Sequence, residues 1–111
     1  IHTMSYPRVA FRPALVSSTI AVTSSSQRVA FSVSSNNVYI TNVGTKECFI
    51  NFGDATVTAT AGGASTLAAD GSMSIPAGFF GVISTGRQTN IAAICAGTDT
   101  TTLRITPGEG E

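Results

Sequence analysis

Polar and apolar side chains alternate most clearly between residues 37 and 54, and we take this stretch as the centre of the fold. Val38 and Ile40 occupy every second position, and the apolar side chains of 48–52 follow the same rule. A period of two places one row of side chains on one face of a β-strand. Residues 42–46, between the two runs, include a glycine and a lysine, which suit a loop tip. The stretch therefore predicts two strands joined as a β-hairpin.

Short runs of the same kind follow one another along the rest of the chain. Turn residues separate them, Asp70-Gly71 is a strong hairpin signal, and no run has the period of an amphipathic helix. We count about eight to nine strands of roughly 4–8 residues, a spacing typical of an antiparallel β-sandwich or jelly roll. With 111 residues the chain forms one such domain, over residues 14–111. The runs outside the central stretch are 14–23, 28–33, 66–69, 72–75, 79–84, 89–96 and 101–106.

Two of these strands, 79–84 and 89–96, carry apolar side chains on both faces. A sheet with one face in water needs only one apolar row, so these strands either lie under a cover or pack against another copy of the chain. We favour self-association, because 111 residues leave little chain to cover them. The residues expected at that contact are Phe79, Phe80, Ile91 and Ile94.

Residues 1–13 differ from the rest and are predicted to form an extended N-terminal arm. We interpret 1–3 as a remnant of cloning, with Met4 as the native start. Two prolines bracket the segment 5–13 and favour extended backbone before each of them. The segment is either an edge strand of its own sandwich or an arm that reaches a neighbouring subunit, where Arg8 and Arg12 would pair with carboxylates.

The charge composition narrows the choice of partners. Six Lys and Arg residues balance six Asp and Glu residues, and only 11% of the chain is charged. A neutral chain without a basic run has no footprint for phosphate, so we expect no nucleic acid partner. The apolar runs are far shorter than the ~20 residues that span a bilayer, and no signal peptide pattern is present. Low charge suits a chain that buries much of its surface against other proteins.

The sequence offers little material for catalysis or for holding a cofactor. His2, the single histidine, lies ahead of the predicted fold, so no Ser-His or Cys-His pair is expected. Asp54, Asp70 and Asp99 each stand where turns commonly place Asp. No spacing of Cys, His or carboxylate side chains fits a metal site. We therefore expect no enzyme, no metal, no cofactor and no small-molecule substrate.

Cys48 and Cys95 each fall within an apolar strand pattern. We favour two small buried hydrophobic side chains. A disulfide between adjacent strands stays open, because the sequence does not give the distance between the two residues. A carbohydrate-binding module also stays open, since Tyr39 is expected to face outward beside Phe49. Cross-strand packing of these two aromatic rings is the simpler interpretation.

Three segments resemble small virion structural proteins of tailed bacteriophages. They are VYITNVGTKECFINFGDATVTAT, IPAGFFGVI and TNIAAICAGTDTTTLRITPGEG, with a TN-x-G-T…F-x-x-FGD pattern, an IAAI strand and a closing TPGEG. The resemblance covers about two thirds of the chain, residues 38–110. Among these proteins the chain looks most like a capsid decoration (cement) protein. The alternatives are a head–tail or tail component and a glycan-binding adhesin module.

The resemblance implies a jelly-roll subunit, commonly a homotrimer, that binds adjacent major capsid proteins on the surface of the virion after synthesis in the host cytoplasm. Under this hypothesis the arm and the tip of the central loop contact the capsid. The residues expected there are Tyr6, Arg8, Phe11, Arg12, Lys46 and Glu47.

Overall fold

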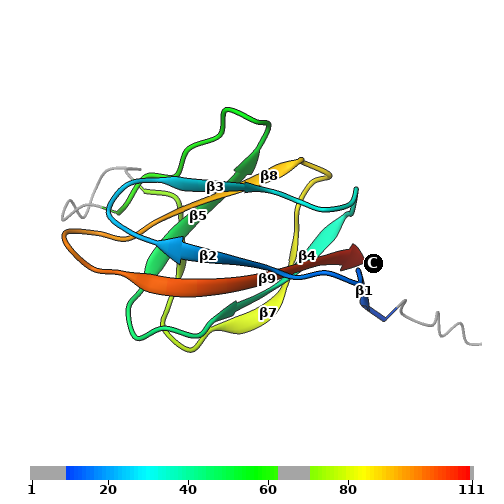
Figure 1. The fold of residues 1–111 in the computed structure, drawn as a ribbon, viewed down its shortest axis with the longest axis horizontal. Coiled ribbons are helices and arrows are strands. Elements are labelled where there is room, and N and C mark those ends of the chain that lie inside the picture. Colours follow the sequence, from blue (N-terminus) through cyan, green and yellow to red (C-terminus); the bar gives the residue numbers. More distant parts are fainter. Residues whose placement is uncertain (1–9, 63–70, 111) are drawn as a thin grey trace, which may run out of the picture.

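Nine antiparallel strands in two sheets make up the part of the chain that the computed structural model describes, residues 10–62 and 71–110 (Figure 1). No helix occurs among these residues. The strands are β1 (Arg12–Pro13), β2 (Ser18–Val22), β3 (Gln27–Ala30), β4 (Asn37–Asn42), β5 (Cys48–Gly53), β6 (Met73–Ile75), β7 (Phe80–Ser84), β8 (Asn90–Ile94) and β9 (Thr101–Glu109).

The strand order is that of a jelly roll. In one sheet, here called sheet A, β9 lies between β2 and β4, β7 follows β4 at the edge, and the short β1 also pairs with β9. In the other, sheet B, the order is β3-β8-β5-β6. Most consecutive strands lie in opposite sheets, as in the paired Greek keys of jelly rolls. The predicted fold class, an all-β antiparallel sandwich, is confirmed.

Alternation along each strand builds the core between the sheets. Every second side chain points inward, and most of the inward positions are apolar. The twelve residues of the core cluster are at most 2% exposed. They are Ile20, Val22, Val38, Ile40, Cys48, Ile50, Ile75, Ile91, Ala93, Cys95, Leu103 and Ile105.

The predicted hairpin at residues 37–54 is wrong, although both of its strands exist. β4 pairs with β7 and β9, whereas β5 pairs with β6 and β8, so the two strands lie in opposite sheets. Residues 43–47 are an arch that carries the chain from sheet A to sheet B. The apolar rows of β4 and β5 both face inward because they face each other across the core. Alternation alone does not distinguish this arrangement from a hairpin.

Position 44 in this arch requires glycine because there is no room for a side chain, and not because its backbone has an unusual φ. The positive φ values among the described residues belong to Gly78, Arg87, Gly86 and Gly97. A Cβ at position 44 would overlap the Thr101 side chain and lie 2.9 Å from the Thr102 backbone nitrogen. The arch therefore packs its backbone directly against the start of β9, which only glycine permits.

A segment of the chain itself covers the outer face of sheet B. Arg28 and Asn51 flank Ala92 in the register of β3, β8 and β5. Arg28 Nη1 donates to the Val57 carbonyl at 3.2 Å, and Asn51 Nδ2 donates to the Thr58 carbonyl at 3.3 Å. Residues 55–62, here called the covering segment, thus pass over Ala92.

Further contacts hold the covering segment along its length. At the β3 side, the Ala59 N–H donates to Ser26 Oγ at 3.0 Å. Thr60 and Ser72 exchange two hydrogen bonds of 2.9 and 3.0 Å ahead of β6. Ala92 is fully buried as a result. The apolar outer face of β8 is therefore explained by an intramolecular cover, which the sequence interpretation had not favoured.

The described end of the N-terminal segment lies on its own sheet. β1 pairs with the last residues of β9, Arg12 opposite Glu109 and Pro13 opposite Gly108 (Figure 1). The Phe11 ring fills the place of a side chain at Gly108, since a Cβ there would lie 2.6 Å from the ring. Arg12 and Pro13 thus form a short edge strand of the chain's own sheet, with Phe11 packed just ahead of it. The rest of the predicted arm, residues 1–9, the predicted strand 66–69 and Asp70 of the predicted hairpin turn lie outside the described residues.

Asn42 connects the arch, β6 and β9 from a fully enclosed position at the end of β4. Its Nδ2 donates to the carbonyls of Lys46 (3.0 Å) and Ile75 (3.2 Å). Its Oδ1 accepts from the Gly44 N–H (3.1 Å) and Thr101 Oγ1 (2.7 Å). All four hydrogen-bonding positions of this amide are used.

We expect Asn42→Ala to lower the free energy of unfolding by about 3 kcal/mol, because it leaves several enclosed donors and acceptors without a hydrogen-bond partner. Urea denaturation measures this loss. Gln88→Ala is the matched control, because it removes an exposed side-chain amide and should cost about 0.5 kcal/mol or less. Equal losses in the two variants would contradict the role given to Asn42.

Candidate functional site

Apolar side chains gather on the outer face of sheet A. Tyr39 of β4 stands opposite Val82 of β7, with Phe80 two residues before Val82. Their exposed fractions are 37% for Tyr39, 48% for Val82 and 71% for Phe80. The Phe11 ring lies beside Tyr39, with ring centroids 6.5 Å apart. These four residues, here called the sheet A patch, are the candidate interaction surface.

The strand that carries half of the patch is also a free edge. Among the described residues β7 pairs with β4 alone. Hydrogen bonds from Asn42 N–H to the Phe79 carbonyl (2.9 Å) and from Thr85 N–H to the Asn36 carbonyl (3.0 Å) show that the odd-numbered residues face β4. The backbone groups of Phe80 and Val82 therefore point away from the sheet. β7 has no charged residue or proline, and its register with β4 is uninterrupted by a bulge; charges, prolines and bulges are devices that usually block edge-to-edge association.

The four residues predicted for self-association have different surroundings. Phe80 is exposed, whereas Phe79 is partly buried against the core. Ile91 is fully buried in the core of its own chain, so its selection as a contact residue is wrong. Ile94 lies opposite Phe49 on the outer face of sheet B, and Gly62 of the covering segment contacts the Phe49 ring. Of these residues, only Phe80 belongs to the sheet A patch.

The residues predicted for capsid contact fall at two ends of the sandwich. Arg12 is at the end where β4 begins and β9 finishes. Lys46 and Glu47 are in the arch beyond the other end of β4, and Glu47 Oε2 accepts a hydrogen bond from Ser74 Oγ. Phe11 is on the sheet A patch beside Arg12, while Tyr6 and Arg8 lie outside the described residues.

Sequence reasoning missed several exposed apolar residues, which include Val33, Val43 and Met73 as well as Val82, Leu15 and Val16. Val82 is two residues after Phe80 on the same strand. Assigning alternate residues of 79–84 to opposite faces would therefore have placed both side chains on one face. Leu15 and Val16, between β1 and β2, are 103% and 58% exposed. Their signal was the position between Pro13 and two serines, where a turn and not a strand was to be expected.

Tyr39 and Phe49 do not form the predicted aromatic pair. Tyr39 is on the outer face of sheet A, and Phe49 is on the outer face of sheet B. The reason is the same as for the wrong hairpin, since β4 and β5 belong to different sheets. Tyr39 has Phe11 as its aromatic neighbour instead.

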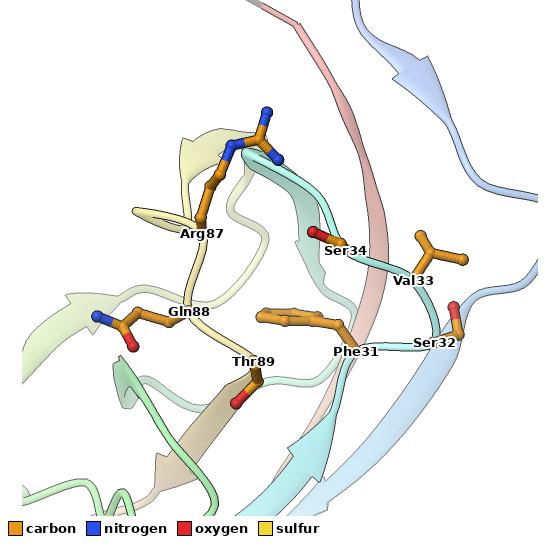
Figure 2. A pocket seen from close by; sticks show the side chains of 7 residues that line it. All are labelled: Phe31, Ser32, Val33, Ser34, Arg87, Gln88 and Thr89. Carbon is orange, nitrogen blue, oxygen red and sulfur yellow. The ribbon is translucent and has the colours of Figure 1, made fainter.

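A hollow of about 190 Å³ lies between the β3–β4 loop and the β7–β8 turn (Figure 2). The Phe31 ring extends between the two loops, with Ser34 above it and Thr89 below it in the view. Small-molecule sites commonly have volumes of roughly 300–1,000 Å³, so this hollow suits only a small group. Its seven lining residues include no carboxylate, thiol or imidazole, and they are Phe31, Ser32, Val33, Ser34, Arg87, Gln88 and Thr89.

The candidate carboxylates do not form a shared site, and Asp54 is engaged in its own turn. Asp54 Oδ1 accepts from Thr56 Oγ1 (2.6 Å) and Thr56 N–H (2.8 Å), and these hydrogen bonds lower the pKa of Asp54. Asp54 follows β5 at the end where β8 begins, whereas Asp99 follows the other end of β8, so the two carboxylates do not meet. Asp70 is outside the described residues. No group of three metal-ligating side chains occurs in 10–62 and 71–110.

Both thiols are buried. Cys48 is fully enclosed, and burial, with smaller contributions from Cys95 and Glu47, raises its pKa from 9.0 to about 12. Burial also raises the pKa of Cys95. A thiol of this kind is protonated near neutral pH and is a poor nucleophile.

Comparison with protein-family models, with characterised proteins and with solved structures finds no significant match to this chain. Among the described residues there is no helix with the length and hydrophobicity needed to cross a membrane.

We expect Phe80→Thr to change the free energy of unfolding by about 0.5 kcal/mol or less, because Phe80 is largely exposed and Thr suits a strand. Ile91→Ala should cost about 3 kcal/mol, because it leaves a cavity in the core. Urea denaturation of the monomeric chain compares the two. A cost for Phe80→Thr as large as that for Ile91→Ala would mean that Phe80 belongs to the core.

The raised pKa of Cys48 predicts a loss of stability in alkali. Between pH 9 and about 12 the unfolded thiol releases its proton while the folded one keeps it, so the free energy of unfolding falls as pH rises. Urea denaturation at several pH values measures the slope. Cys48→Val, which has no ionisable group, should show a shallower fall, and equal slopes would contradict the assignment.

Proposed function

We propose that this protein is a non-enzymatic decoration (cement) protein of a bacteriophage capsid, which binds adjacent major capsid proteins and stabilises the mature head. The observation that carries the proposal is the sheet A patch on a free, uncharged edge strand. The resemblance of residues 38–110 to small virion proteins is the reason for proposing a bacteriophage capsid as the partner. The fold by itself adds little, because jelly rolls serve many functions.

The patch supports a role in assembly. Apolar surface left in water contributes to association at about 25 cal/mol per Å² when a partner covers it. Patches of this kind on soluble proteins commonly mark contacts with other proteins. The chain is also poor in charge, at 11%, so little desolvation of charges opposes such burial.

The separation of the two predicted contact regions supports a bridging role. Arg12 lies at one end of sheet A, beside the exposed Leu15 and Val16, and Lys46 lies beyond the other end. A subunit with contact groups at both ends reaches two neighbours on a shell. Several weak contacts made at once give strong binding, which is what a cement protein needs against internal pressure.

Self-association as a homotrimer belongs to the same proposal. We assign its contact to the sheet A patch and the free edge of β7, and no longer to Ile91. The edge offers unpaired backbone groups and the patch offers apolar area, and both come from Phe80 and Val82.

Two other assignments use the same surfaces with different partners. A head–tail or tail component would bind tail proteins in place of the shell. A glycan-binding adhesin would use the aromatic pair of Phe11 and Tyr39 on the outer face of sheet A. Tyr39→Ala would then abolish sugar binding and leave capsid occupancy unchanged.

The first test is the solution mass by light scattering, together with co-sedimentation on undecorated capsids of the phage that encodes the chain. We expect three times the chain mass of 11.3 kDa and saturable capsid binding. Phe80→Asp places a charge in the patch. The variant should be monomeric, and its affinity for capsids should fall at least about tenfold. Thr19→Asp adds the same charge on β2 of sheet A, away from the patch, and should behave like the native chain.

Deletion of residues 1–9 tests the arm without removing β1, which begins at Arg12. Capsid binding should fall while the unfolding midpoint stays unchanged. A native chain that is monomeric and does not bind capsids would refute the decoration assignment. Normal capsid binding by the deletion variant would refute only the claim that residues 1–9 contact the capsid.

A further inference from the structure

Cys48 begins β5 and Cys95 directly follows β8, and these two strands are neighbours in sheet B. The register of β5 and β8 pairs Phe49 with Ile94 and Ile50 with Ala93. Continued by one residue, this antiparallel register places Cys48 directly opposite Cys95. Directly opposed residues have Cβ atoms about 4.5–5.5 Å apart, or less at the closer kind of pair.

The backbone hydrogen bonds identify this pair as the closer kind. The N–H of Cys95 donates to the Thr23 carbonyl at 2.8 Å, and Thr23 lies ahead of β3, on the side of β8 away from β5. Cys48 is paired with Ile75 of β6 on the other side of β5. The two cysteines therefore exchange no backbone hydrogen bonds. Such pairs have Cα atoms about 4.5 Å apart, within the roughly 4.4–6.8 Å that a disulfide spans.

Both side chains also point the same way. Cys48 and Cys95 belong to the core cluster between the sheets and are 0% and 1% exposed. Both thiols are free in the structure. The effect of Cys95 on the pKa of Cys48 agrees with their closeness.

We infer that Cys48 and Cys95 form an intrachain disulfide when the chain folds in an oxidising medium, and that this bond joins β5 to β8 at the arch end of sheet B. The inference does not depend on which partner the sheet A patch binds. The same chain in a reducing cytoplasm keeps both thiols, because glutathione and thioredoxin hold cytosolic cysteines reduced.

The chemistry is thiol–disulfide exchange with a low-molecular-weight disulfide such as oxidised glutathione. The thiolate of one cysteine attacks a glutathione sulfur, forms a mixed disulfide and releases one reduced glutathione. The second cysteine, as its thiolate, attacks the protein sulfur of the mixed disulfide and releases the second reduced glutathione. The chain loses two hydrogens, and one glutathione disulfide becomes two thiols.

Burial determines when this reaction occurs. With the Cys48 pKa at about 12 and both thiols enclosed, the folded chain presents almost no thiolate to a reagent. Exchange therefore takes place while the chain folds or opens, and the folded structure then protects the finished bond. The bond closes a loop of the chain that contains the covering segment, β6 and β7.

The test is to refold the full chain from urea in a glutathione buffer, either oxidising or reducing, and then to alkylate it with iodoacetamide in denaturant. After oxidising refolding we expect an unmodified chain about 2 Da lighter than the reduced one, as a single chain on a non-reducing gel. After reducing refolding we expect two alkylated cysteines. The oxidised form should melt on the order of 10 °C higher, because the cross-link restricts the unfolded chain.

Cys48→Val is the control, since it keeps an apolar side chain but leaves one thiol. It should show the same melting temperature in both buffers. Two alkylated cysteines, a glutathione adduct or an interchain dimer after oxidising refolding would each overturn the inference. So would a melting temperature of the native chain that does not depend on the buffer.

Discussion

One apolar layer, shared by two sheets, is the constraint on which the rest of this structure depends. Each strand contributes every second side chain to it, and the inward rows of β4, β5, β8 and β9 are almost completely enclosed. Because a strand offers only one face to the layer, both sheets are needed to close it, and six of the eight connections between consecutive strands cross from one sheet to the other. The arch 43–47 is one of these crossings, and in it the backbone at Gly44 lies close to Thr101.

The arch end of this layer is held by a polar group and not by further apolar packing. Asn42 satisfies all of its hydrogen-bonding capacity within the fold and links the arch, β6 and the start of β9. A buried amide of this kind is tolerated only in the one arrangement that satisfies it. It therefore selects the crossing between the sheets over other pairings of the same apolar strands.

The two outer faces of the sandwich differ in how far the chain covers them, and this difference locates the candidate interaction surface. Sheet B is covered by residues 55–62, which bury Ala92 and contact Phe49. Sheet A has Phe11 against Gly108 at one edge, while Phe80 and Val82 at the other edge stay exposed. The apolar residues of β7 and β8 looked alike in the sequence, yet only those of β7 are available to a partner.

The sequence by itself determined the all-β class and the approximate position of most strands, because alternation with a period of two is a local property that each run carries alone. For β4 and β5 it also determined which residues share the inward row, as Val38, Ile40, Cys48 and Ile50 show. Only the tertiary structure decided which strands pair, because an inward row looks the same in a hairpin and across a sandwich. For the same reason Tyr39 and Phe49 came to lie on different sheets, Ile91 was placed in the core, and Cys48 and Cys95 were brought face to face by residues far apart in the chain.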